Sequence, residues 1–186
     1  MRISKAQAGE NRNRMVSAAS ELFRAHGFES VSVADVMRAA GFTHGGFYNH
    51  FDSKEALAAE AVAQAWAAMA AHRAGAAQLS ELLSSYLSQA SRDAPGKACP
   101  AAALAGDVRR QPDGVRRAFI EGLQDMIGEL QAQLAGDPEL CRRRAVALAT
   151  RMIGALILSR AAPDGSALAQ ELLSANLVAA HEELAS

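Results

Sequence analysis

The sequence predicts an all-α protein, and three observations support that class. Alanine is abundant and only 5% of the residues are aromatic, while valine and isoleucine do not gather in alternating runs, which favours helices over strands. Apolar residues recur at spacings of three and four. Glycines and prolines stand where such runs would end and begin. A chain of 186 residues can bury a core in one or two domains.

Composition and charge exclude several classes of protein. The formal net charge is −1, but the first fifty residues are mildly basic, so a local surface for nucleic acid remains possible. Two cysteines, Cys99 and Cys141, are too few for a disulfide framework or a paired-cysteine zinc site. The opening residues are polar, and the apolar run 145–158 is shorter than the ~20 residues of a membrane span. We expect a cytoplasmic protein with no metal and no cofactor.

Two short helices joined by a tight turn are predicted near the N-terminus. Ser32 and Asp35 form a capping pair that opens the first of them, and Gly41 ends it. Thr43 then caps a helix of about two turns over residues 44–50. Short helix, glycine-containing turn and short helix together have the layout of a helix-turn-helix.

The other predicted helices are longer. Gly27 ends the first of them, and the pair Asp52 and Glu55 opens the helix that leads into the rest of the chain. Pro100, Pro112 and Pro138 each suit a first helical turn, where a missing N–H does no harm. The expected ranges are 9–26, 52–73, 79–92, a short helix after Pro100, 112–134, 138–160 and 166–184.

The stretch 31–57, VSVADVMRAAGFTHGGFYNHFDSKEAL, resembles the TetR family of bacterial repressors. The resemblance covers the second helix, the turn, the recognition helix and the start of the fourth helix. Beyond it, the chain is similar to the family in helix count and length. It implies a helix-turn-helix domain over 1–54 and a helical domain for effector binding and dimerisation over 55–186. It also implies a homodimeric repressor that binds palindromic operator DNA and is released by a small molecule.

The predicted DNA contacts follow from which side of the recognition helix faces inward. Phe47 and Phe51 lie four residues apart and are expected in the core, which turns their neighbours outward. The phosphate donors are expected to be Thr43, Tyr48, His50 and Lys54. His44 and Asn49 are the candidates for reading bases, and the glycines allow close backbone approach. With few base-reading side chains, specificity leans on DNA shape. The full predicted set is Ser32, Thr43, His44, Gly45, Gly46, Tyr48, Asn49, His50 and Lys54.

The resemblance places the effector pocket roughly within residues 60–160. The candidate lining residues, each of which also suits an ordinary core, are Trp66, Met69, Tyr86, Cys99, Leu104, Phe119, Leu123 and Met126. The last two helices are expected to pair with their mates in a four-helix interface. The predicted dimer contacts, for which an intramolecular core is the alternative, are Leu148, Met152, Ile153, Leu156, Leu168, Leu172 and Leu177.

Several alternatives stay open at this stage. Cys99 stands at a helix start near Lys97, a setting that stabilises a thiolate, so a sensor of oxidants or electrophiles is one alternative and a small buried hydrophobe is the other. Cys141 is interpreted as a surface residue beside three arginines. A ligand-independent regulator and an activator are also compatible with the sequence. An enzyme is not expected, because no phosphate loop, nucleophile elbow or HExxH pair is present.

Overall fold

The computed structural model describes residues 4–74 and 78–185, and this part of the chain consists of helices without a strand. The N-terminal elements are α1 (Lys5–His26), α2 (Val33–Ala39), the 3₁₀ helix η1 (His44–Asn49) and α3 (Lys54–Ala74). The elements that follow are α4 (Leu79–Tyr86), α5 (Gln89–Asp93), the 3₁₀ helix η2 (Pro95–Lys97), α6 (Pro100–Val108), α7 (Asp113–Ala132), α8 (Pro138–Ala161) and α9 (Ala167–Ala185). The predicted all-α class is confirmed.

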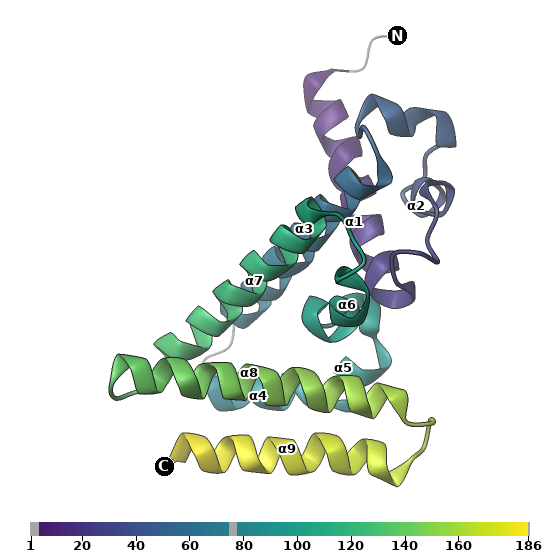
Figure 1. Cartoon of the computed structure of the whole chain (residues 1–186). Coiled ribbons are helices and arrows are strands. Elements are labelled where there is room, and N and C mark those ends of the chain that lie inside the picture. The colour runs from purple at the N-terminus through teal and green to yellow at the C-terminus, as the bar shows by residue number, and fades with distance from the viewer. Residues whose placement is uncertain (1–3, 75–77, 186) are drawn as a thin grey trace.

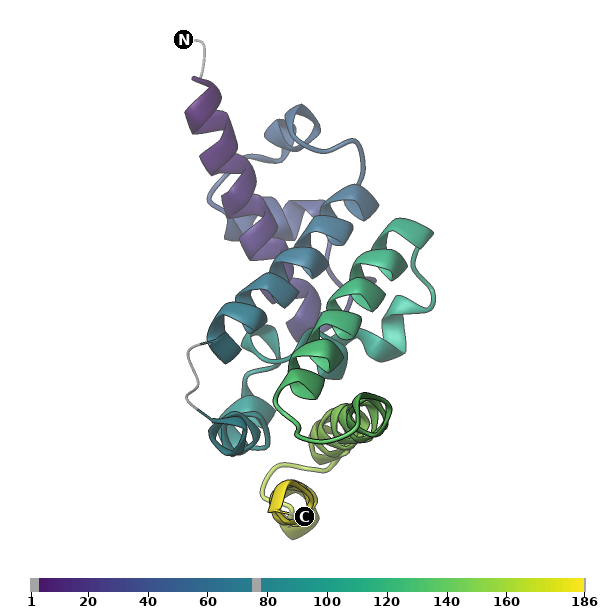
Figure 2. The ribbon, with the colours of Figure 1, turned by 90° about the vertical axis from the view of Figure 1, so that its left-hand side faces the viewer.

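The helices are arranged from one end of the molecule to the other (Figure 1). The N-terminus, α1, α2 and η1 form one end, and the paired helices α8 and α9 form the opposite end with the C-terminus. Helices α3 and α7 run side by side between them, as the view turned by 90° also shows (Figure 2). Among the described helices, none is both long enough and apolar enough to cross a membrane.

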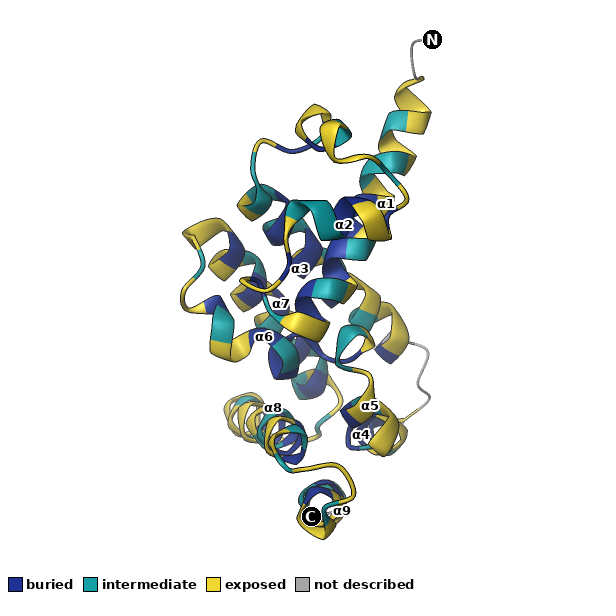
Figure 3. Cartoon of the chain, turned by 90° about the vertical axis from the view of Figure 1, so that its right-hand side faces the viewer, coloured by how far each residue is buried: buried dark blue, intermediate teal, exposed yellow. Residues whose placement is uncertain are grey.

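One buried cluster runs through the whole molecule. It includes Phe23 of α1, Leu57 of α3, Leu83 of α4 and Met152 of α8, and the buried faces of these helices turn toward one another (Figure 3). Helix α3 contributes to it along its length, since Leu57, Val62 and Trp66 are all buried. The predicted division at residues 54 and 55 falls in the first turn of α3, and its standing as a domain boundary remains a prediction.

Helices α3 and α7 approach closely where Trp66 faces Gly122. A Cβ atom built on Gly122 would lie 2.1 Å from the Trp66 ring. Trp66 also meets Phe119 of α7 edge-on, with ring centroids 6.1 Å apart. The missing side chain at position 122 therefore makes room for the largest side chain of the neighbouring helix.

Three element boundaries differ from the prediction because hydrogen-bonding side chains decide them. Helix α1 begins at Lys5, four residues earlier than expected, since Ser4 accepts from the Gln7 amide. Helix α3 begins at Lys54, and the side chain that accepts from its first turn belongs to Ser53, not Asp52. A single helix over 79–92 was predicted, but the helix is interrupted after α4. The Ser88 side chain then caps the separate helix α5.

The predicted position of Cys141 was wrong. Its side chain is 4% exposed, and the thiol lies 3.6 Å from the Leu134 carbonyl oxygen. The apolar inner face of α8 includes this position, whereas the arginines that follow it lie on other faces.

Candidate DNA-binding surface and effector cavity

The turn between α2 and η1 is fixed by backbone bonds and by one arginine. Gly41 adopts a positive φ of 76°, and the Phe42 amide donates to the Met37 carbonyl at 2.8 Å. Arg14 of α1 donates to the Ala40 carbonyl at 2.7 Å and lies over the Phe42 ring, 4.6 Å from its centroid. Arg14 therefore holds this turn against α1.

The predicted third helix is present but is a 3₁₀ helix. Residues 44–49 are tightened by bonds between residues three apart, such as the Gly46 amide to the Thr43 carbonyl at 3.2 Å. Two consecutive glycines weaken α-helix formation, and short 3₁₀ helices suit such connections. Thr43 occupies the N-cap position, but its side chain makes no capping bond. The N-cap position predicted for Thr43 is therefore confirmed, but its side chain does not form the capping hydrogen bond.

Two phenylalanines anchor η1 in the core. Phe47 is 0% exposed and Phe51 is 3% exposed, and their rings stack with centroids 5.6 Å apart. Arg12 lies over the outer face of Phe51 at 4.4 Å and forms an ion pair with Glu60 of α3. The expected core positions of both phenylalanines are confirmed, and Arg12 has a structural role between α1 and α3.

The outer side of η1 carries most of the predicted DNA-contacting residues. Tyr48 is 67% exposed and stands edge-on against Phe47, with centroids 5.1 Å apart. The side chains of Thr43, His44 and Asn49 are exposed, and His50 is half-buried. These residues gather at one end of the molecule, opposite α8 and α9 (Figure 1).

The two glycines of η1 are not required by the fold. Neither has a positive φ, a Cβ atom at Gly45 would meet nothing within 4 Å, and one at Gly46 would touch Met37 at an ordinary 3.6 Å. Their small size therefore leaves space outside the protein, next to the exposed side chains.

Ser32 and Lys54, the two predicted contacts that lie outside η1 and its cap, both make bonds within the chain. Ser32 forms the predicted capping box: its hydroxyl accepts from the Asp35 amide at 3.2 Å, and its own amide donates to the Asp35 carboxylate at 3.0 Å. The Ser32 hydroxyl and the Ser32 amide both donate to the Asp35 carboxylate, and these bonds lower the pKa of Asp35. The Lys54 ammonium donates to the Phe28 carbonyl at 2.6 Å. Lys54 thus ties α3 to the loop before α2, in contrast to the outward position expected of a phosphate donor.

A cavity of about 550 Å³ opens between the end of α1, the C-terminal part of α3, α4 and the start of α6. Its apolar lining consists of Ala68, Met69, Leu82, Ala98, Cys99 and Leu156. Its polar lining includes Arg24, His72, Arg73, Glu81, Tyr86 and Lys97. The volume falls in the range of sites for small organic ligands.

The predicted pocket residues divide into two groups. Met69, Tyr86 and Cys99 line this cavity. The other five do not, and that part of the expectation needs correction. Trp66 and Phe119 pack on each other between α3 and α7. Leu104 and Met126 are 1% exposed and Leu123 packs against the same core.

The basic residues of the cavity were missed by sequence reasoning. Arg24 belongs to the last turn of α1, which periodicity assigns to the DNA-binding half. It is 9% exposed, and its guanidinium donates to the Ala98 carbonyl at 2.8 Å and the Ser20 carbonyl at 3.0 Å. Burial lowers the pKa of Arg24. No local pattern shows that α1 reaches the cavity, because the contact joins residues 74 positions apart.

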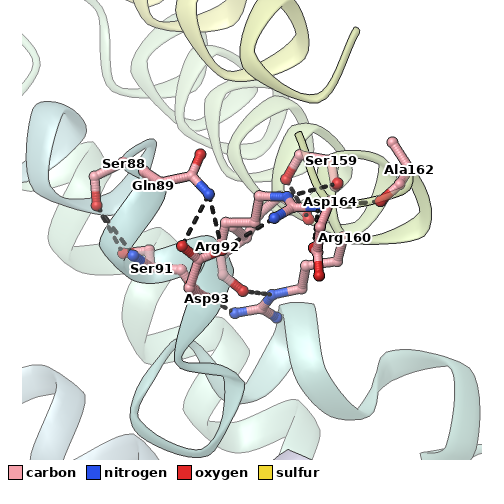
Figure 4. A network of polar contacts seen from close by, with 10 residues as sticks. Ser88, Gln89, Ser91, Arg92, Asp93, Ser159, Arg160, Ala162 and Asp164 are labelled. Carbon is pink, nitrogen blue, oxygen red and sulfur yellow. Dashed lines mark hydrogen bonds and ion pairs between the residues drawn. The ribbon is translucent and has the colours of Figure 1, made fainter. Parts of the chain in front are cut away.

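A polar network fixes α5 to the end of α8 beside the cavity (Figure 4). Arg92, 7% exposed, donates to the carbonyl groups of Ser159 and Ala162, both at 3.0 Å. Arg160 donates in the other direction, to the Ser91 carbonyl at 2.7 Å. The last turn of α8 and the segment that leads into η2 are therefore held together by charged donors on neutral acceptors.

The predicted dimer residues, which lie on α8 and α9, differ in their burial. Leu148, Met152 and Leu156 are at most 2% exposed within one chain, so for them the intramolecular alternative holds. Ile153 is half-buried, as are Leu172 and Leu177 of α9, and Leu168 is 56% exposed. The large apolar residues that stay exposed on these two helices include Leu140, Val146, Ile157, Leu158, Leu168 and Val178.

The exposed short helix, anchored by two phenylalanines after a glycine turn, defines a helix-turn-helix protein with a second helical part that contains a cavity. Residues 15–61 match the model of the family described as bacterial regulatory proteins, tetR family. This match covers the helix-turn-helix segment, which is similar to that of the TetR family.

Two curated relatives are similar over the same segment. The uncharacterized HTH-type transcriptional regulator YdgC of Bacillus subtilis is 40% identical over 58 residues, which are 31% of this chain and 30% of that protein. The HTH-type transcriptional regulator UidR of Escherichia coli K12 is 38% identical over 53 residues, 28% of this chain and 27% of that protein. The match thus spans less than a third of either relative.

Solved structures are similar over the whole length. A TetR-family regulator from Cytophaga hutchinsonii has a TM-score of 0.78 at 18% identity, covering 100% of this chain and 97% of that one. The reduced form of NemR from Escherichia coli has a TM-score of 0.75 at 18% identity, covering 93% and 96%. A regulator from Agrobacterium tumefaciens has a TM-score of 0.75 at 21% identity, covering 95% and 98%. At these identities the likeness establishes the fold.

Proposed function

We propose that this chain is a transcriptional repressor that binds a palindromic operator as a homodimer and leaves it when a small molecule fills the cavity. The observation that carries the proposal is the exposed side of η1 inside the segment that matches the family model. A helix-turn-helix places such a helix in the major groove.

The chemistry of this side suits DNA. Tyr48 and Thr43 are neutral donors for phosphate oxygens, and Asn49 has the amide geometry that recognises adenine. The glycines let the backbone come close to the groove. Because Lys54 is occupied by the Phe28 carbonyl, the phosphate contacts rest on the remaining residues of the predicted set.

The dimer is supported by the outer faces of α8 and α9. Val146 and Ile157 lie three helical turns apart on one side of α8 and are 41% and 37% exposed. Gly154 lies between them in sequence, and in the described part of the chain no other element comes within 4 Å of the place of its Cβ atom. Exposed apolar side chains and a mid-helix glycine suit close packing against a second helix. Two recognition helices would then read the two halves of a palindrome.

The link between cavity and DNA rests on α1 and α3. Arg24 of α1 and Met69 of α3 line the cavity. Arg12 and Arg14, also on α1, contact the Phe51 ring and the turn before η1. A ligand that favours another position of these helices changes the spacing of the two recognition helices. Ligand and DNA must then weaken each other by the same factor, typically worth ~1–3 kcal/mol.

The first test is selection of genomic DNA fragments by the purified protein at physiological salt, followed by sequencing. We expect enrichment of one palindromic site. The control is the double variant Tyr48→Ala, Asn49→Ala, which alters only exposed side chains and should enrich nothing. If the unaltered protein also enriches no site above background, the proposal is wrong.

A ligand-independent repressor would bind the same site with unchanged affinity in the presence of every compound that the cavity binds. The redox alternative is not favoured, because Cys99 is 1% exposed and lies in the wall of the cavity. An oxidant that acts on it has to enter the cavity first.

A further inference from the structure

The charge of the cavity lining is predominantly positive. Arg24 and Arg73 are each 9% exposed, and Lys97 lines the same space. The lining carboxylate is Glu81, and Arg73 is also paired with Glu129 of α7. Within the lining itself, the three cations stand against one carboxylate. The hydrogen bonds of Arg24 go to uncharged oxygens, and Glu21 is the carboxylate whose charge acts on it.

Two buried donors in the lining lack an acceptor in the part of the chain that the structure describes. They are Nη1 of Arg73 and the hydroxyl group of Tyr86, whose residues are 9% and 7% exposed. Nη1 of Arg160, which lies behind the cavity and whose Nη2 is held by Ser91, also lacks one. A buried donor without an acceptor is destabilising, and native proteins rarely keep several together.

The surroundings of Tyr86 keep its hydroxyl protonated. Burial raises the pKa of Tyr86 well above its usual value, and the neighbouring Cys99 thiol raises it further. Sulfur is a weak acceptor, and no hydrogen bond of normal geometry joins the two groups. The hydroxyl is therefore a donor beside a guanidinium, and both line the same cavity.

We propose that the cavity takes an organic acid. Its carboxylate accepts from Nη1 of Arg73 and from the Tyr86 hydroxyl, and its apolar body lies against Met69, Leu82 and Leu156. Arginine and a neutral donor together match the two oxygens of a carboxylate. A cationic ligand would place its charge among the arginines, and a neutral one would gain no ionic hydrogen bond from Arg73. The inference rests on the proposed function in taking this cavity as the effector site.

Matched compounds test the charge directly. Each of four apolar groups, hexyl, octyl, decyl and 4-phenylbutyl, is tested as its carboxylic acid, its primary amide and its amine. Binding of each compound to the full chain is measured by calorimetry. We expect the acid of the best-fitting body to bind at least tenfold more tightly than its amide, and the amine not to bind. The inference is overturned if an amide or amine binds as tightly as its acid, or if no acid binds at millimolar concentration.

Variants test the two donors. Tyr86→Phe keeps the ring in its place, and Arg73→Gln removes the charge; each should weaken acid binding about tenfold and change amide binding less than twofold. Arg116→Gln, on the exposed side of α7, is the control and should change neither. If Arg73→Gln fails to fold by circular dichroism, Tyr86→Phe decides alone, and unchanged acid affinity there overturns the assignment.

A parallel titration of DNA binding separates this inference from the proposed function. An acid that binds without reducing operator affinity leaves the acid site established and overturns ligand release. If instead a neutral or cationic compound that competes for the cavity releases DNA, the repressor proposal stands and the acid inference is wrong.

Discussion

The guanidinium of Arg24 donates a 2.8 Å hydrogen bond to the carbonyl oxygen of Ala98. Arg24 lies in the last turn of α1, the helix that contacts the turn before η1, and Ala98 lies in the wall of the cavity. The bond therefore fixes the last turn of α1 to the wall of the cavity. Because the guanidinium is buried, the bond is charge-assisted and shielded from competing water.

The variant Arg24→Met should show the value of this contact. It keeps an apolar stem of similar length but leaves the Ala98 carbonyl without its donor. We expect the free energy of unfolding to fall by about 1–3 kcal/mol, measured by urea denaturation. Arg116→Met, on an exposed site of α7, should change it by less than about 0.5 kcal/mol. Equal stability of both variants would show that the Arg24 bond contributes nothing net.

Lys54→Met should destabilise the chain without altering the salt dependence of DNA binding. The Lys54 ammonium is held by the Phe28 carbonyl at 2.6 Å, so its loss should cost about 1–2 kcal/mol of unfolding free energy. Arg38→Met, whose side chain on α2 is 76% exposed, is the stability control. A fall of about one unit in the slope of log affinity against log salt for Lys54→Met would mean that Lys54 contacts a phosphate after all.

Gly45→Ala should separate folding from DNA binding. The added methyl group meets nothing within 4 Å in the chain, and alanine restricts the unfolded state, so stability should be equal or up to about 1 kcal/mol higher. Operator affinity, followed by fluorescence anisotropy, should fall about tenfold or more, because the methyl group enters the space left for the groove. Gly114→Ala, which also meets nothing within 4 Å among the described residues but lies on α7, should change stability within the same range and leave operator affinity unchanged.

Charge on the outer face of α8 should prevent dimerisation. Ile157→Glu places a carboxylate among exposed apolar side chains, and sedimentation should show a monomer at concentrations where the unaltered chain is a dimer. Ile120→Glu is the matched control, since Ile120 is 49% exposed on α7. Dimers of Ile157→Glu as stable as those of the control would rule this face out.

Local patterns were sufficient for most of the fold. Gly27 and Gly41 both adopt positive φ where helix ends were predicted, and the Ser32 and Asp35 capping box forms as expected. Phe47 and Phe51 are buried as their spacing predicts. Each of these features depends on a few consecutive residues, so the local sequence was enough to predict it.

Contacts over long sequence distances limited the prediction of the sites. Lys54 seemed free for phosphate because its acceptor, Phe28, lies 26 residues away. Helix α8 is apolar on two opposite sides, so its periodicity could not show that Leu148 and Met152 face inward while Val146 and Ile157 face outward. The cavity was placed on the right helices for Met69 and Tyr86, but its arginines are recognisable only once α1, α3 and α6 are packed together.

The close contact between Trp66 and Gly122 should also constrain how these two positions change among homologous chains. A Cβ atom at position 122 would lie 2.1 Å from the indole, so a larger residue there requires a smaller residue at position 66 or a displacement of α3 from α7. Across an alignment of full-length homologues, we expect the two positions to covary, with a larger residue at one matched by a smaller residue at the other. This pair can then serve as a sequence marker for chains in which these two helices approach as closely as they do here.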